Sequence, residues 1–307
     1  MPVVQSDSLE ALTRTTSAEV APTITTSVSA ERIARQMEAL GPLPAVALEV
    51  MQLTEDPNSD AKDLQQSISR DAVIAGKVLR MANSAYFSSG TPCQTLQQAS
   101  TRLGMKMIRN LVVSSCVTGM MDRDLPNYPY HSFGLQKHSL ATGLITGEIV
   151  TRLGLPRTLI DELFLDGLLH DVGKLVLNPL LPSRVIATGI TGIERERLLT
   201  GTDHAAVGIL MAEHWKLPAH AVAVIGHHHD VTGVDEDFRA HAAVVGICDW
   251  LLNMRRIGLA DDAQDVAPHP DDSALDALEI DQERLTEFTS DIDDALVTIL
   301  EFCDAAI

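Results

Sequence analysis

Residues 159–177 read LIDELFLDGLLHDVGKLVL, and this stretch decides the fold class of the chain. Leucine, isoleucine, phenylalanine and valine recur in it at three- and four-residue spacing, which predicts a helix with a buried apolar face. Near the end of this apolar run the sequence places His170 and Asp171. A buried carboxylate without a partner costs several kcal/mol, so the pair requires partners from other segments of the chain.

The same feature recurs in other predicted helices, which carry a histidine or an aspartate within an apolar run. The residues concerned are His138, His228, His229 and Asp249. A divalent cation is the economical way to satisfy several such side chains at once, and mixed histidine and carboxylate ligands suit Mn, Fe, Zn, Co or Ni. Adjacent helical residues can reach one centre only at a helix edge or end, and Gly173 weakens the helix there. The pattern predicts a site for one or two transition-metal ions.

The chain as a whole is predicted to be all-α, with an N-terminal multi-helix lobe packed on a helical bundle. Aromatic residues are only 4% of the sequence and no stretch alternates with period two, which argues against strands. We expect four segments: a disordered Ser/Thr-rich tail (1–29), the N-terminal lobe (30–125), the bundle (126–260), and an acidic connection followed by a pair of amphipathic helices that pack on the bundle (261–307).

Turn and capping residues divide the N-terminal lobe into short helices. Ser59 or Asp60 can cap one helix, and Asp71 can cap the next. Residues 96–120 supply two further helices with a break near Gly104.

The charge balance limits the classes of partner. Lys and Arg number 23 and Asp and Glu 42, which gives a formal net charge of −19. Such a surface repels phosphate backbones and anionic lipids, so neither nucleic acid nor a membrane is expected as a partner. The N-terminus lacks a signal-peptide pattern and no apolar run reaches spanning length, so a cytoplasmic location is expected. The four cysteines form no Cys-x-x-Cys pair and are expected to be free thiols.

Motifs along the chain resemble those of a known superfamily. HSLATG, LFLDGLLHDVGKLVL, DHAAVGILMAEHWKLP, AVIGHHHD and AAVVGICDWLL, in this order, resemble the HD superfamily of metal-dependent phosphohydrolases. The upstream half, residues 40–89 and 96–113, resembles the N-terminal half of HDOD domains, which are HD relatives found in bacterial signalling proteins. The resemblance to HDOD proteins extends over roughly residues 38–253.

The resemblance implies a set of site residues. Lys174 would lie near the metal and contact phosphate or orient water, and with Asp171 it forms the implied catalytic pair. Four other histidines, at positions 214, 220, 241 and 269, are expected to have structural roles. The implied metal ligands are His138, His170, Asp171, His204, His228, His229 and Asp249.

The sequence leaves the activity open between different classes of function. The Gly-Tyr-Pro element of the cyclic-dinucleotide hydrolases is absent, because the chain reads HHHDVTGVDEDF at that point. This absence favours a regulatory module whose N-terminal lobe binds signalling proteins. The complete ligand set favours the alternative, a metal-dependent phosphohydrolase acting on a nucleotide or other phosphoester. A third reading is a metal-free scaffold whose histidines only form hydrogen bonds. An apolar face on the terminal helices would permit a homodimer.

Overall fold

The computed structural model describes residues 27–87, 90–182, 192–260, 270–290 and 292–307. Of the residues in these ranges 71% are helical and none lies in a β-strand, which confirms the predicted all-α class. Within the described ranges, Tyr130 and Leu259 form an isolated antiparallel β-bridge. Most of the predicted N-terminal tail and the start of the acidic connection fall outside the described ranges.

The N-terminal helices begin and end at the capping and turn residues that the sequence contains. Asp60 accepts hydrogen bonds from the backbone N–H groups of Lys62 and Asp63, and Asp71 caps the following helix in the same way. Gly104 separates the last two helices with a φ of 83°, a conformation that favours glycine. These helices are α1 (Ala30–Leu40), α2 (Ala45–Glu55), α3 (Ala61–Ile68), α4 (Ala72–Ala82), α5 (Leu96–Leu103) and α6 (Met105–Met121).

The central helices form a bundle in which the two long helices, α7 and α13, pack with shorter ones. Short 3-10 turns, Arg157–Leu159 and Asn178–Leu180, precede α8 and follow α9. The bundle helices are α7 (Gly134–Leu153), α8 (Ile160–Leu169), α9 (Gly173–Leu177), α10 (Gly192–Thr200), α11 (His204–His214), α12 (Ala219–His227) and α13 (Glu236–Met254).

Two sequence-based expectations about helix length require correction. The stretch 159–177 is not one helix, because α8 ends at Leu169 and α9 begins at Gly173. The C-terminal region contains three described helices instead of a pair: α14 (Asp272–Ala277), α15 (Gln282–Ser290) and α16 (Asp293–Ala306).

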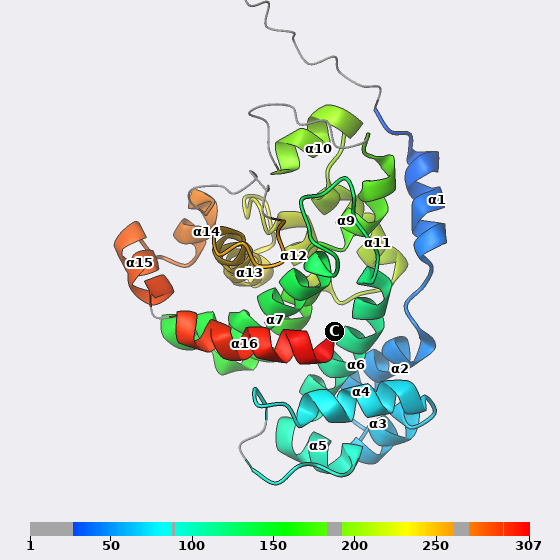
Figure 1. Cartoon of the computed structure of the whole chain (residues 1–307). Helices are drawn as coiled ribbons and strands as arrows, with labels where there is room; N and C mark the ends of the chain where they lie inside the picture. Colours follow the sequence, from blue (N-terminus) through cyan, green and yellow to red (C-terminus); the bar gives the residue numbers. More distant parts are fainter. Residues whose placement is uncertain (1–26, 88–89, 183–191, 261–269, 291) are drawn as a thin grey trace, which may run out of the picture.

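Helix α6 links the two halves of the molecule. It packs on α2 and α4 along one side and on α8 along another. Its central residues Ile108, Leu111 and Val112 are fully buried. Helix α16 lies across α7 and reaches α4, so the C-terminal end of the chain also contacts both halves (Figure 1). Helix α1 packs on α9 in the bundle, beside a hydrogen bond from Trp215 Nε1 to the Gly41 carbonyl oxygen of 3.0 Å.

Other features of the described residues bear on the sequence analysis. All four cysteines (Cys93, Cys116, Cys248 and Cys303) are buried free thiols, as predicted. Among the helices described, none combines the length and the apolar character needed to cross a bilayer.

The crossing of α7 and α8 yields a prediction about stability. A Cβ atom added at Gly143 would lie 2.6 Å from the backbone carbonyl oxygen of Phe164, so the two helices could not keep their separation. We expect Gly143→Ala to lower the free energy of unfolding by about 2 kcal/mol, as overpacked cores do. Urea unfolding monitored by circular dichroism measures this change.

Gly147→Ala is the matched control on the same helix. A Cβ there would meet only Ile160 Cγ2 at 3.6 Å, an ordinary contact, so the higher helix propensity of alanine should stabilise the protein by up to ~1 kcal/mol. If both substitutions change the free energy of unfolding equally, the close approach of α7 and α8 at Gly143 does not determine the effect.

Candidate metal centre

The bend between α8 and α9 positions the centre. His170 follows the last residue of α8, and Asp171 lies in the turn before α9. Next to them, a Cβ added at Gly173 would lie 1.9 Å from the His204 carbonyl oxygen, so glycine allows α9 to contact the start of α11. This close approach brings His204 to the side of Asp171. His170 and Asp171 thus lie at a helix end, the position from which both side chains can reach one centre.

One group of residues gathers around the bend from three parts of the bundle. His138 comes from the first half of α7 and Asp249 from the second half of α13. Together with His170 and Asp171 they offer ligand atoms that all lie within 4.8 Å of one another, and all four side chains are buried. The closest pair is His138 Nε2 and Asp249 Oδ1, at 2.9 Å.

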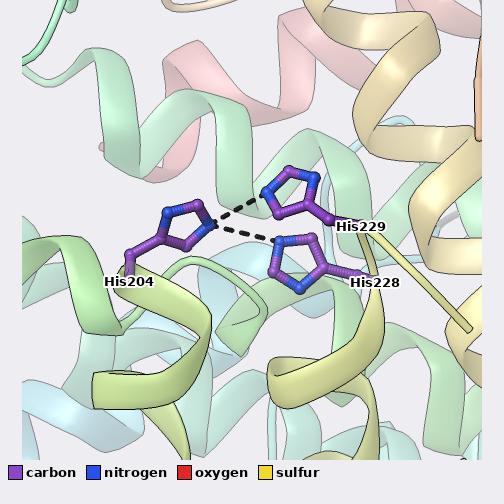
Figure 2. Close-up of side chains that lie close together, drawn as sticks. All are labelled: His204, His228 and His229. Carbon is purple, nitrogen blue, oxygen red and sulfur yellow. Dashed lines mark hydrogen bonds between the residues drawn. The ribbon is translucent and has the colours of Figure 1, made fainter. Parts of the chain in front are cut away.

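A second group of three histidines lies beside the first. His204 begins α11, and His228 and His229 follow the end of α12 (Figure 2). The Nε2 atom of His204 is 3.4 Å from that of His228 and 3.0 Å from that of His229. The three ligand atoms again fall within 4.8 Å of one another.

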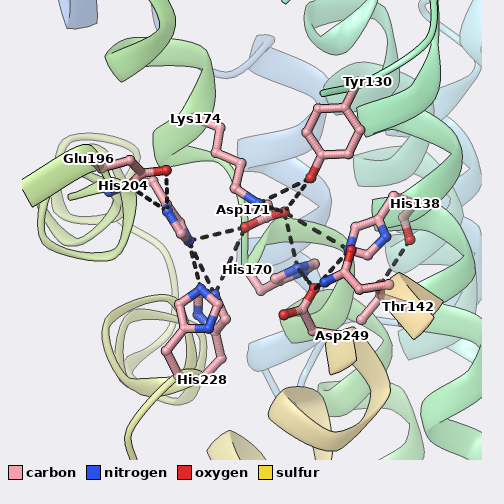
Figure 3. Close-up of polar contacts among 12 residues, drawn as sticks. Tyr130, His138, Thr142, His170, Asp171, Lys174, Glu196, His204, His228 and Asp249 are labelled. Atoms are coloured by element: carbon pink, nitrogen blue, oxygen red, sulfur yellow. Dashed lines mark hydrogen bonds and ion pairs between the residues drawn. The ribbon is translucent and has the colours of Figure 1, made fainter. Parts of the chain in front are cut away.

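Asp171 stands between the two groups. Its Oδ1 atom lies 3.3 Å from His204 Nε2 and 3.8 Å from His228 Nε2. Its Oδ2 atom lies 3.3 Å from His170 Nε2 and 3.9 Å from His138 Nε2. One carboxylate therefore contacts both groups, each through a different oxygen (Figure 3). All seven residues that the resemblance nominated are brought together in this way.

The histidine rings share an orientation that exposes Nε2 to the centre. The Nδ1 atoms of three rings face backbone carbonyl oxygens: Ile257 for His138 (3.3 Å), Gly167 for His170 (2.7 Å) and Val224 for His228 (3.1 Å). A carbonyl oxygen can only accept, so these bonds place a proton on Nδ1 and direct the Nε2 atom inward. Metal-binding histidines are oriented in this manner.

Two buried atoms support the fit of a cation. His170 Nε2 and Asp171 Oδ1 belong to fully buried residues, yet neither makes a hydrogen bond among the described residues. Buried polar atoms without hydrogen bonds are rare and point to an additional ligand. Imidazole nitrogens together with carboxylate oxygens form a donor set for a first-row transition metal.

Electrostatics within the centre depend on the same residues. Burial alone would lower the pKa of His170, but the carboxylates of Asp171 and Asp249 raise it to about 10. Burial would raise the pKa of Asp171, but His170 and Lys174 hold it well below its usual range. In contrast, burial and the charge of His204 lower the pKa of His229 to about 4. Near neutral pH the carboxylates and the neutral His229 imidazole are therefore available as ligands, whereas a bound ion would displace a proton from His170.

Lys174 lies beside Asp171 and Tyr130. Its Nζ atom is 2.6 Å from Asp171 Oδ2 and 3.0 Å from the hydroxyl of Tyr130, which itself donates to Asp171 Oδ2 at 3.2 Å. Burial would lower the pKa of Lys174, but Asp171 raises it well above its usual value. The ammonium group therefore stays charged beside Asp171.

The sequence analysis did not identify the residues that support the ligands. Glu196 on α10 is buried and approaches His204 Nδ1 to 2.8 Å, and it accepts a bond of 2.7 Å from the His204 backbone N–H. Asn253 donates to Asp249 at 2.8 Å, and Tyr130 contacts both Asp171 and Lys174. A buried acid in the charged segment GIERERLLT carries no signal of its own, because its partner is brought close only by the fold.

Four histidines were expected to have structural roles. Those that the structure describes lie apart from the candidate ligands. His220 and His241 bind carboxylates in a separate cluster, with contacts of 2.6 Å to Asp166 and 3.2 Å to Glu162. His214 is exposed at the end of α11, and His269 lies outside the described residues.

Solved structures with the same fold come from several bacteria. An HDOD domain protein of unknown function from Geobacter sulfurreducens is 23% identical, with a TM-score of 0.68, over 90% of this chain and 97% of its own. A candidate phosphohydrolase from Shewanella amazonensis is 23% identical, with a TM-score of 0.66, over 90% and 98%. A candidate signal transduction protein from Marinobacter aquaeolei is 20% identical, with a TM-score of 0.69, over 90% and 65%.

Sequence comparison supports a family assignment. An uncharacterized protein from Treponema pallidum is 26% identical over 239 residues, which are 75% of this chain but only 45% of that protein, so the chain spans about half the length of this relative. The family model of the HDOD domain matches residues 40–231, which is more than half of the chain. This chain therefore belongs to the HDOD domain family, which is related to the HD phosphohydrolases.

Proposed function

We propose that this chain is a regulatory HDOD protein of bacterial signalling in which one or two divalent transition-metal ions hold the helical bundle in a defined arrangement. The observation that carries the proposal is the position of Asp171, which contacts one histidine group through Oδ1 and the other through Oδ2. A carboxylate in this position suits two neighbouring ions. The ligands would be His138, His170, Asp171, His204, His228, His229 and Asp249.

The regulatory role rests on how the centre is connected to the N-terminal lobe. The residues of the centre come from α7, α11, α12, α13 and the turn after α8, so a bound ion would fix these elements relative to one another. Helix α8 also packs on α6 of the N-terminal lobe. A change in the centre would therefore reach the N-terminal lobe, through which we propose that signalling proteins bind.

A second candidate function is phosphoester hydrolysis, and the position of Lys174 favours it. Bound ions would lower the pKa of a coordinated water and neutralise phosphate charge. The charged Lys174 ammonium is held beside Asp171 by Tyr130 and can steady negative charge that develops on a phosphate group. The missing Gly-Tyr-Pro element places this function second.

Metal content is the first test. We expect tag-free wild-type protein incubated with Mn or Fe under reducing conditions to retain one or two ions, measured by elemental mass spectrometry. The variant with both His170→Ala and Asp171→Ala should retain none, because it removes the bridging carboxylate and its neighbour together. Chelation of the wild-type protein should lower its melting temperature, since an ion at 100 times its Kd stabilises by about 2.7 kcal/mol.

His214→Ala is the control for the metal measurement. His214 lies on the same helix as His204 but is exposed, so its loss should leave metal content and melting temperature unchanged. Wild-type protein that takes up no metal under these conditions would contradict the proposed centre.

A second prediction concerns Glu196. Replacing it with glutamine keeps its shape but removes the charge that orients His204 Nδ1, so we expect metal affinity to fall about 10- to 100-fold with the fold intact. Competition with a chromophoric chelator measures the affinity. Glu194→Gln changes an exposed acid on the same helix and should have no effect. If both substitutions behave alike, Glu196 does not position His204.

Turnover separates the two candidate functions. With Mn present, we expect the wild-type protein to hydrolyse p-nitrophenyl phosphate and cyclic dinucleotides far more slowly than about 1 s⁻¹, the low end of typical enzyme rates. Faster turnover that disappears in Lys174→Met, with metal content retained, would instead establish the phosphohydrolase.

A further inference from the structure

A second polar cluster lies along the same helices that build the candidate metal centre. Glu162 precedes His170 by eight residues on α8, His220 precedes His228 by eight on α12, and His241 precedes Asp249 by eight on α13. Eight residues span about 12 Å of helix. We call Glu162, Asp166, His220 and His241 the outer cluster. Its members are paired, with His220 bound to Asp166 and His241 bound to Glu162, and the two rings stack 5.9 Å apart.

The N-terminal lobe places a buried cation beside the outer cluster. Arg109 on α6 is only 1% exposed. Its Nε donates to Asn110 at 3.1 Å and its Nη1 to Glu55 at 3.2 Å, whereas Nη2 makes no hydrogen bond among the described residues. Burial lowers the pKa of Arg109, but an arginine remains ionised at neutral pH. A buried guanidinium nitrogen without an acceptor calls for an additional partner.

Arg109 borders a cavity between the lobe and the bundle. The cavity has a volume of about 620 Å³ and is also lined by Glu55, Glu162, Lys216 and His220. This volume and its place between two parts of the chain are typical of small-molecule sites. The N-terminus of α12 meets the cavity at Pro218, where no side chain caps the free N–H groups.

Each carboxylate on the cavity wall already faces a donor. Glu55 accepts from Arg109, and Glu162 accepts from His241 and faces Lys106 at 3.5 Å. Asp56, also on the wall, accepts from Asn58. In contrast, Arg109 Nη2 lacks an acceptor, and Lys216 forms no ion pair with any described residue. The hydrogen bond to Asp166 raises the pKa of His220 against the effect of burial.

We propose that this cavity is a binding site for a small molecule that carries a carboxylate or phosphate group, with Arg109 as the anchor and Lys216 at the entrance. Both anions match the planar, charged donors of a guanidinium group. A ligand there would touch α2 and α6 of the lobe and the start of α12 in the bundle, and its binding would stabilise the junction between them. The site does not depend on a metal in the neighbouring centre.

The test uses full-length protein freed of metal by chelation, in phosphate-free buffer at constant ionic strength. Inorganic phosphate and acetate are titrated separately by calorimetry, with melting temperature as a second readout. We expect saturable binding of at least one anion with a Kd on the order of 1 mM, as a fragment of this size allows. The anion that binds more tightly identifies the group that the natural ligand carries.

Two variants and a control locate the binding. Arg109→Lys keeps the charge but loses the forked geometry and should weaken binding about tenfold. Lys216→Gln should weaken it about threefold, because Lys216 is exposed. Lys62→Gln changes an exposed lysine on α3 outside the cavity and should have no effect. If Arg109→Lys fails to fold, the comparison of Lys216→Gln with Lys62→Gln decides. The proposal is overturned if the wild-type protein binds neither anion saturably, or if Lys216→Gln and every folded Arg109 variant bind like the wild type.

Discussion

The buried carboxylate of Asp171 is the constraint on which the rest of the centre depends. Asp171 is fully buried. Without partners, its negative charge would cancel most of the free energy of unfolding of an ordinary domain. Helix α8 must end just before it, since a continuous helix would direct it away from His170. Gly173 must lack a side chain so that α11 can approach. The bend, the glycine and the surrounding histidines are thus consequences of burying one negative charge.

Side chains of the protein place positive charge on one side of the Asp171 carboxylate. The Lys174 ammonium lies 2.6 Å from Oδ2, and His170, with its pKa raised to about 10, is protonated beside the same oxygen. Beside Oδ1, burial lowers the pKa of His228 well below its usual range. The two oxygens therefore differ in their surroundings, because Lys174 lies beside Oδ2 whereas His204 and His228 lie beside Oδ1. The backbone bonds to Nδ1 of His138, His170 and His228 keep these rings in a geometry that suits an ion on either side.

Local sequence signals predicted much of this arrangement. Caps at Asp60 and Asp71 and the break at Gly104 follow from backbone chemistry within a few residues. Polar residues inside apolar runs indicated the centre, because burial makes such residues costly wherever they lie. The C-terminal region has one break more than the predicted pair of helices. Glu279, between α14 and α15, adopts a left-handed φ of 54° without a glycine or proline to indicate it.

The supporting residues could not be predicted in the same way. Glu196 belongs to a segment so rich in charge that it resembles a solvated helix, and only the packing of α10 buries it. The histidines 220 and 241 were correctly separated from the candidate ligands, but their carboxylate partners on α8 are far away in sequence.

Helix α8 carries Glu162 and Asp166 of the outer cluster and is followed directly by His170 of the candidate metal centre. It also packs on α6 of the N-terminal lobe. Glu162, Asp166 and His170 follow one another at four-residue spacing and so lie along one side of the helix. On α6, Asn110 donates to the backbone carbonyl of Asp161 at 2.6 Å, next to the start of this series. A packed helix moves as a rigid unit, so a displacement of α6 against α8 would shift the outer cluster and His170 together. This mechanical link suits a protein whose bundle reports its state to a partner bound on the lobe.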